Sequence, residues 1–376
     1  MSVTVCLAAN TLFYPQGGGH LWAYLNWALG FKSLGCRVVW LEGAAPNRPA
    51  EQVRQHLELL RCRLKPHGLA DGLALWKHDG AFSPDELHGA LPVEAALEAD
   101  LLVNQQYGMR ADLVARFRRS ALLDIDPGLT QLWLSRGLMT MAPHDFYFTI
   151  GETVGRAGAR FPDNGLPWRY TPPCVSIEHW AEHAAPEEAP LTTVTHWSMG
   201  KWEEHEGELY ANDKRTGFLP YLDLPGRTSQ ALELALLLGD WDQDERGLLE
   251  SHGWRVSDSH AVASTPDDYQ AYIQGSRGEF SCVKPSCVRL QNAWISDRSL
   301  CYLASGKPVV VEHTGPSRFL PDAEGLLRFR SMDEALDRIE ELRSDYSRHA
   351  KAARRLAEEY FDARKVARRL LEQALD

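Results

Sequence analysis

The sequence has no apolar run long enough to cross a membrane. No stretch of its 376 residues approaches 18 uninterrupted apolar residues, and its first ten residues lack the basic segment of a secretory signal peptide. The seven cysteines are an odd number and form no Cys-x-x-Cys pair, so we expect reduced thiols and no structural zinc. These features predict a cytoplasmic protein without a membrane span.

Basic residues are outnumbered in this chain. The 40 Lys and Arg residues face 51 Asp and Glu residues, which gives a formal net charge of −11. Because DNA and RNA gain affinity from Lys and Arg side chains that replace counterions, we expect no nucleic-acid partner. A hydrophobic content of 44% is typical of a globular protein, and 376 residues suit two α/β domains.

The first part of the chain has the pattern of a βαβ unit. An apolar strand is expected at 2–9, a glycine-rich turn at 17–19, a helix with apolar residues at helical spacing over 21–29, and a buried strand at 37–41. Further apolar runs at 100–104, 120–125 and 146–150 are expected to extend a parallel sheet. A Pro- and Glu-rich stretch at 184–190 predicts a linker, so the first domain covers 1–185.

The α/β alternation restarts after this linker. We expect a strand at 192–197, a helix at 228–238, a strand at 278–283, a helix at 297–304 and a strand at 307–311. These elements predict a second doubly wound domain over 186–346. The segment 347–376 has a charged helical pattern, with Leu356, Tyr360 and Val366 as candidate buried positions.

Residues 283–315 resemble the donor-binding motif of the GT-B glycosyltransferases. Pro285 and Ser286 match its Pro-Ser pair, and the stretch YLASGKPVV at 302–310 matches its helix end, glycine turn and strand. The sequence departs from the motif where Cys301 replaces the second of two glutamates; the first glutamate is also missing, and the loop between them is about four residues longer.

The resemblance implies an α/β fold of the GT-B type, with two doubly wound Rossmann-like domains and an inter-domain cleft. It implies that 1–185 binds the acceptor, that 186–346 binds a nucleotide-sugar donor, and that 347–376 crosses back to the first domain. The implied activity is transfer of a sugar from a UDP- or GDP-sugar to a hydroxyl group of a small molecule or glycan. It requires no cofactor and no metal.

The leaving diphosphate gains negative charge as the glycosidic bond breaks, so cations and helix N-termini are the groups to seek. Lys201, Lys284 and Arg298 follow predicted strands or begin a predicted helix, and Ser299 adds a hydroxyl at the same helix start. The alternative for each is an ordinary surface or helix-entry residue. Asp297 is a candidate to accept the ribose hydroxyls, unless Ser296 or Asp297 only caps the helix.

The glycine-rich turn before the first helix is similar to the opening of the GT-B enzymes. There, Gly18 and Gly19 would let backbone amides approach the donor phosphates or the acceptor. His20 follows them, and inverting family 1 enzymes carry their catalytic histidine in a similar Gly-His sequence. His20 is therefore a candidate general base for the acceptor hydroxyl.

Those enzymes orient their histidine with an aspartate that follows a later strand. Asp124 and Asp126 follow the apolar run at 121–123, and either is a candidate for this role. The alternative is that 126–128 forms only a turn.

Three other functions compete with glycosyl transfer. Gly17 to Gly19 and Glu42 imitate the fingerprint of a nicotinamide-dependent oxidoreductase, but Trp22 stands where the third glycine is needed. A nucleotide-sugar epimerase shares the two-domain architecture, and a non-catalytic sugar- or nucleotide-binding protein would explain the missing glutamates. The sequence leaves the acceptor, the stereochemistry and the oligomeric state open.

Overall fold

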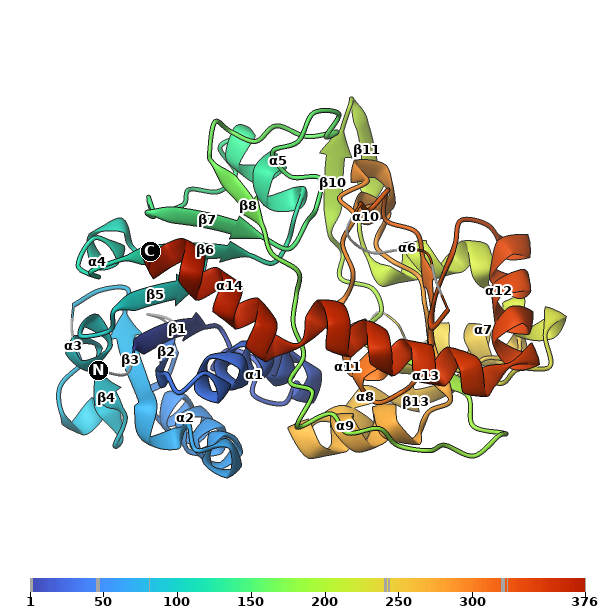
Figure 1. Cartoon of the computed structure of the whole chain (residues 1–376), viewed down its shortest axis with the longest axis horizontal. Helices are drawn as coiled ribbons and strands as arrows, with labels where there is room; N and C mark the ends of the chain where they lie inside the picture. The colour runs from blue at the N-terminus through green and yellow to red at the C-terminus, as the bar shows by residue number, and fades with distance from the viewer. Residues whose placement is uncertain are drawn as a thin grey trace. The chain divides into compact units, whose positions relative to one another are not determined.

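The computed structural model describes residues 3–44, 48–80, 82–239, 242, 244–318, 322 and 324–375. The chain divides into two compact units. Unit 1 consists of residues 1–157, 161–176 and 362–376, and unit 2 consists of residues 158–160 and 177–361. Each unit is built on its own parallel sheet with helices around it (Figure 1). The predicted fold class of two doubly wound α/β domains is confirmed.

The sheet of unit 1 has eight strands in the order β4-β3-β2-β1-β5-β6-β7-β8. Every neighbouring pair is parallel. The strands are β1 (Thr4–Ala9), β2 (Arg37–Ala44), β3 (Leu73–Lys77), β4 (Leu91–Pro92), β5 (Leu101–Asn104), β6 (Ser120–Asp124), β7 (Phe146–Thr149) and β8 (Trp168–Tyr170). The central strands are buried along almost their whole length, which explains their nearly continuous apolar sequences.

Six α-helices lie among the described residues of unit 1. They are α1 (Gly18–Ser33), α2 (Ala50–Leu64), α3 (Val93–Leu97), α4 (Ala111–Val114), α5 (Leu129–Ser135) and α14 (Ala363–Leu375). Helices α1 and α14 pack closely together although they lie at opposite ends of the chain (Figure 1). A Cβ atom at Gly30 would lie 2.6 Å from the carbonyl oxygen of Ala363, so glycine permits this close approach.

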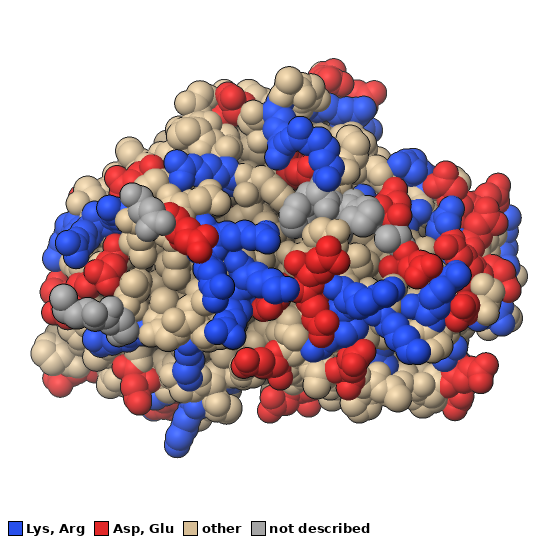
Figure 2. Space-filling view, in the orientation of Figure 1, with Lys and Arg blue, Asp and Glu red and all other residues tan. Residues whose placement is uncertain are grey.

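Helix α14 is held in unit 1 by its apolar face and by its last turn. Val366 and Leu370 are buried. Arg119 donates a hydrogen bond to the carbonyl of Ala374 at 2.8 Å, and Arg169 donates one to the carbonyl of Gln373 at 3.0 Å. These arginines satisfy carbonyls that the end of a helix leaves without partners. Lys and Arg side chains gather over the exposed face of this helix (Figure 2).

The sheet of unit 2 has six parallel strands in the order β13-β12-β9-β14-β15-β16. They are β9 (Leu191–His196), β12 (Leu232–Leu237), β13 (Arg255–Asp258), β14 (Gly278–Ser281), β15 (Val309–Glu312) and β16 (Leu326–Phe329). A separate antiparallel hairpin joins β10 (Trp202–His205) to β11 (Glu208–Ala211).

The prediction of a helix at 228–238 is wrong. This segment contains β12, which pairs with β9 and β13 near the middle of the sheet. Its Leu-rich sequence is short, and a short apolar run fits a buried strand and a buried helix equally well. Burial on both faces of the parallel sheet decides in favour of the strand.

The helices of unit 2 are α6 (Lys214–Phe218), α7 (Glu245–Ser251), α8 (Ser259–Ala263), α9 (Pro266–Gly275), α10 (Pro285–Leu290), α11 (Asp297–Ala304), α12 (Met332–Ser344) and α13 (Tyr346–Leu356). On one side of the sheet, Phe280 stacks on Phe329 with ring centroids 5.2 Å apart, and Tyr221 packs against both rings. No helix among the described residues is both long enough and apolar enough to cross a membrane.

Lys307 is a fully buried cation of unit 2. It precedes β15 and therefore lies at the amino edge of the sheet. Within the described part of the chain, its ammonium nitrogen has no hydrogen-bond partner. Burial, together with the positive charge of Arg277, lowers the pKa of Lys307 to about 8. Such a group opposes folding, because the unfolded chain hydrates the same charge.

Replacing Lys307 with methionine should stabilise the protein. The folded pKa is about 8 and the ordinary value is 10.5, so the cost of burying the charge is complete below pH 8 and disappears above pH 10.5. We expect Lys307→Met to raise the free energy of unfolding by about 1–3 kcal/mol at neutral pH. Denaturant unfolding across this pH range measures the effect. Lys351→Met, at an exposed position of α13, is the control and should show no such pH dependence. A less stable Lys307→Met protein at neutral pH would contradict the prediction.

Candidate functional site

The strand order of each sheet reverses beside its first strand. In unit 1 the chain adds β2, β3 and β4 on one side of β1 and then adds β5 on the other side. In unit 2 it adds β12 and β13 on one side of β9 and then β14 on the other. Open parallel sheets bind ligands outside the carboxyl ends of their strands at such a reversal. We call the β1–β5 edge the unit 1 switch point and the β9–β14 edge the unit 2 switch point.

Two of the predicted diphosphate-binding lysines follow strands of the unit 2 switch point. Lys201 lies five residues beyond the end of β9 and is exposed. Lys284 lies three residues beyond the end of β14, is half-buried, and directly precedes α10. Because β9 and β14 are parallel neighbours, both lysines leave the same edge of the sheet.

Lys214 is a cation of this switch point that the sequence analysis missed. It is the first residue of α6, a helix capped by Asp213, and its side chain is 8% exposed. Its ammonium group donates a hydrogen bond to the carbonyl of Cys282, the residue that follows β14. Burial, together with the nearby charge of Arg298, lowers the pKa of Lys214 to about 8. An anion bound beside this ammonium group would favour its charged form and raise this pKa.

The side chain of Arg298 is held by three hydrogen bonds to β9 and β14 of unit 2. Its guanidinium group donates to the carboxylate of Glu279 at 2.7 Å, to the hydroxyl of Ser281 at 2.7 Å and to the carbonyl of Val194 at 3.1 Å. Burial disfavours the charge, but the fully buried Glu279 raises the pKa of Arg298 above its ordinary value. Arg298, which the sequence predicted to face the diphosphate, therefore joins α11 to β9 and β14.

The start of α11 contains the other predicted donor residues. The hydroxyl of Ser296 accepts a hydrogen bond from the backbone N–H of Arg298 at 3.3 Å, so Ser296 is the helix cap. Asp297 is the first helical residue and is half-buried, whereas Ser299 is only 2% exposed. The structure thus places Ser299 in the interior and leaves Asp297 closer to the surface.

Glu312 is a second residue that the sequence analysis did not single out. It ends β15, beside β14, and its carboxylate accepts the backbone N–H of Val283 at 2.9 Å. Burial raises the pKa of Glu312. This hydrogen bond fixes the segment that leads to Lys284.

His20 lies in the first turn of α1, at the unit 1 switch point. Its Nε2 atom is 2.8 Å from the carbonyl oxygen of Asn10, which follows β1. A carbonyl only accepts, so Nε2 carries the proton and the lone pair of a neutral imidazole is on Nδ1. Gly18 and Gly19 precede His20 in the same turn, which has no side-chain cap among the described residues. Its backbone N–H groups therefore point out of the helix toward the end of β1.

Glu42 orders the loop between β1 and α1. This fully buried carboxylate accepts hydrogen bonds from the N–H and hydroxyl of Thr11, from the N–H of Leu12 and from the indole N–H of Trp40. Burial raises the pKa of Glu42 to about 7, although each of these hydrogen bonds opposes the rise. The carboxylate of Glu42 is buried and already accepts hydrogen bonds from this loop. The structure therefore gives no support to the ribose-binding role that the oxidoreductase alternative requires.

Asp124 is the centre of a different hydrogen-bond network. Its buried carboxylate accepts from the hydroxyls of Tyr107, Thr130 and Thr149 at 2.7–2.8 Å and from the side-chain amide of Gln131 at 2.9 Å. Asp126 is exposed, and its N–H donates to Asp124 at 3.1 Å. Among the described residues, no hydrogen bond joins His20 to either aspartate; the carbonyl of Asn10 occupies the orienting position instead.

His144 is a neutral histidine at the carboxyl end of β5. Its Nδ1 donates to the carbonyl of Ala142 at 2.8 Å, so its Nε2 accepts the side-chain amide of Asn104 at 3.0 Å. Burial lowers the pKa of His144 to about 4. In the described part of the chain, no group of three or more His, Cys, Asp or Glu side chains could hold a metal ion.

Comparison with known proteins gives structural but no sequence relatives. No protein-family model and no curated protein matches the sequence. The HepE protein of Anabaena, solved with UDP and glucose, aligns with a TM-score of 0.57 over 99% of each chain at 13% identity. An alpha-glucosyltransferase, solved with UDP and a 13-mer DNA containing a HMU base, aligns with a TM-score of 0.61 over 99% of each chain at 11% identity.

These similarities extend over both units and not over one sheet alone. At 11% and 13% identity, they establish the fold. The chain therefore has the GT-B fold, with two parallel-sheet Rossmann-like domains, that is found in these two UDP-bound proteins.

Proposed function

We propose that this protein is a glycosyltransferase that moves a sugar from a nucleotide-diphosphate sugar to the hydroxyl group of a small molecule or glycan. The donor binds at the unit 2 switch point and the acceptor at the unit 1 switch point. The observation that carries the proposal is Lys214, a buried ammonium group with a lowered pKa at the carboxyl edge of a parallel sheet. Burying such a charge is unfavourable unless an anion compensates it.

The donor diphosphate supplies that anion. Lys214 lies at the edge from which Lys201 and Lys284 also leave the sheet, which supports placing the leaving diphosphate near these three cations. Asp297 accepts the ribose hydroxyls in this proposal, and Arg298 supports the site through its ion pair with Glu279. We propose UDP as the nucleotide because HepE and the alpha-glucosyltransferase were both solved with UDP.

The acceptor is proposed to be something other than a nucleic acid. The alpha-glucosyltransferase was solved with DNA, but this chain has a net charge of −11. The face drawn in Figure 2 carries Asp and Glu side chains between its Lys and Arg side chains. The net negative charge of the chain would repel a polyanionic acceptor more than a glycan or a small alcohol.

His20 is proposed as the general base. The acceptor oxygen bonds to the anomeric carbon, the bond from that carbon to the diphosphate oxygen breaks, and the diphosphate leaves with the electron pair. The acceptor proton passes to Nδ1 of His20, which is the unprotonated nitrogen when Nε2 donates to Asn10. Direct displacement of this kind inverts the anomeric configuration.

Replacing Lys214 with methionine should weaken UDP binding. A hydrogen bond to a charged group contributes about 1.5–3 kcal/mol, so we expect the Kd for UDP to rise about tenfold to a hundredfold. Isothermal titration measures the Kd for UDP and for GDP, and the comparison tests the choice of base.

Lys307→Met is the matched control for this experiment. Lys307 is also a buried lysine whose pKa is lowered to about 8, but it lies at the opposite, amino edge of the same sheet. It should leave the Kd for UDP unchanged. Equal affinities of wild-type and Lys214→Met proteins for UDP would refute the assignment of the donor site.

Replacing His20 with alanine should slow catalysis and spare donor binding. General-base catalysis contributes about 10²–10⁴-fold, so kcat should fall by that factor while the Kd for UDP stays the same. Steady-state kinetics and titration together separate the two effects. His183→Ala, an exposed histidine of unit 2, is the control. A nearly normal kcat for His20→Ala, or a product with retained anomeric configuration, would show that His20 is not the base.

A further inference from the structure

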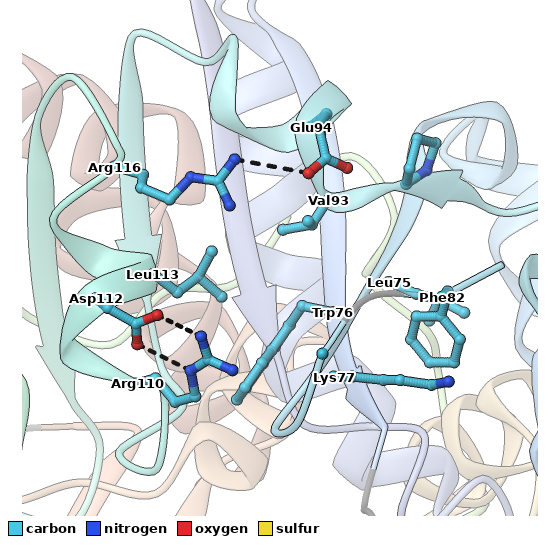
Figure 3. A pocket seen from close by; sticks show the side chains of 12 residues that line it. Leu75, Trp76, Lys77, Phe82, Val93, Glu94, Arg110, Asp112, Leu113 and Arg116 are labelled. Atoms are coloured by element: carbon cyan, nitrogen blue, oxygen red, sulfur yellow. Dashed lines mark hydrogen bonds and ion pairs between the residues drawn. The ribbon is translucent and has the colours of Figure 1, made fainter.

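Unit 1 has two adjoining cavities at the carboxyl ends of β2 and β3. The larger one has a volume of about 290 Å³ and is lined by Arg48, Lys77, His78, Phe82 and Glu86, among others. The smaller one lies against Trp76 and shares Lys77 and Phe82 with the first (Figure 3). We call them together the β2–β3 cavity. They open at the same edge of the sheet as the unit 1 switch point, two and three strand positions from β5.

Three of the Lys and Arg side chains that line the β2–β3 cavity are paired with carboxylates. Figure 3 shows Arg110 paired with Asp112 and Arg116 paired with Glu94. Lys77 pairs with Glu86 at 2.7 Å. A bound phosphate or carboxylate would therefore meet a carboxylate beside each of these cations.

Arg48 is the remaining cation of the larger cavity, and backbone carbonyls hold it. Its guanidinium group donates to the carbonyl of Leu12 at 3.3 Å and to that of Phe13 at 3.1 Å. It also lies over the ring of Phe13, 4.5 Å from the centroid. Asp79 adds a further carboxylate to the lining. The lining thus offers no group of uncompensated cations for an anion.

The cavity combines aromatic surface with hydrogen-bonding groups of both kinds. Phe82 lines both parts, and the ammonium group of Lys77 lies 4.4 Å from its ring centroid. Trp76 forms the wall of the smaller part, with the ring of His78 4.4 Å away. Carboxylates accept, Lys and Arg donate, and a neutral imidazole does both. A sugar ring presents apolar C–H faces and hydroxyls that donate and accept, so its chemistry matches this lining.

We propose that the β2–β3 cavity binds the terminal sugar unit of an uncharged glycan acceptor. This inference rests on the proposed glycosyltransferase function and names its acceptor class. The volume of about 290 Å³ is at the lower end of the range for small-molecule pockets, about 300–1,000 Å³, which suits a terminal unit better than a long chain. Phe82 is the residue on which the sugar packs, and the paired ions at the rim bond its hydroxyls.

The test uses the full chain and ligand-observed NMR. The probes are neutral disaccharides of glucose, galactose and mannose, with digalacturonic acid as the acidic comparison and UDP as the donor-site reference. We expect saturation transfer to at least one neutral disaccharide and weaker transfer to the acidic one. Phe82→Ala should weaken binding of that disaccharide about threefold to tenfold, because an aromatic contact is lost.

Three controls make the result specific. Phe82→Tyr keeps the aromatic face and should retain binding. Leu138→Ala removes a 69% exposed apolar side chain of unit 1 that does not line the cavity, and it should retain binding. All variants should bind UDP as the wild type does, and an unchanged circular dichroism spectrum and Tm should show that unit 1 is folded in each of them.

The inference is overturned if no neutral disaccharide binds, if Phe82→Ala binds it normally, or if digalacturonic acid binds more tightly. When UDP still binds in these cases, only the acceptor assignment fails. A wild-type protein that binds no UDP would instead contradict the proposed function.

Discussion

The parallel direction of every strand within each main sheet governs where chemistry can take place in this protein. Parallel strands bring all their carboxyl ends to one edge, where the loops that follow them meet. Two buried lysines of unit 2 illustrate the difference between the edges. Lys214, at the carboxyl edge, bonds to the carbonyl after β14, whereas Lys307, at the amino edge, has no hydrogen-bond partner in the described part of the chain. Their lowered pKa values are alike, yet only Lys214 lies where the fold binds ligands.

Buried charges stabilise the loops at these edges. Glu42 orders the β1–α1 loop, Asp124 joins residues that follow β5 and β6 to the last residue of β7, and the Arg298–Glu279 pair joins α11 to two strands of unit 2. Burying such groups is unfavourable unless several hydrogen bonds compensate. Each of the three has at least three partners, so the loops are held by directional bonds. Preorganisation of this kind is what a catalytic edge requires.

The sequence predicted eight of the sixteen strands in the described part of the chain, because a buried parallel strand is a short apolar run, as at 37–41 and 307–311. The same rule failed at 228–238, where periodicity alone did not distinguish a strand from a helix. For the candidate site, spacing placed His20 at a helix start and predicted that Arg298 faces the donor diphosphate. The partner of Arg298 is Glu279, 19 residues earlier, and only the folded sheet shows that the pair is internal. Lys214 was missed for the converse reason, because burial and not sequence sets it apart.

The group that orients His20 determines how much of the lowering of the barrier comes from the base and how much from the cations at the donor. The resemblance in the sequence predicted an aspartate beside His20, whereas the carbonyl of Asn10 lies there in this structure. A neutral carbonyl fixes the imidazole tautomer, but it stabilises the protonated ring less than a carboxylate does. In the proposed transfer, His20 is therefore oriented by a group that gives the protonated ring less stabilisation. More of the lowering of the barrier must come from the departing diphosphate, and therefore from the cations around Lys214.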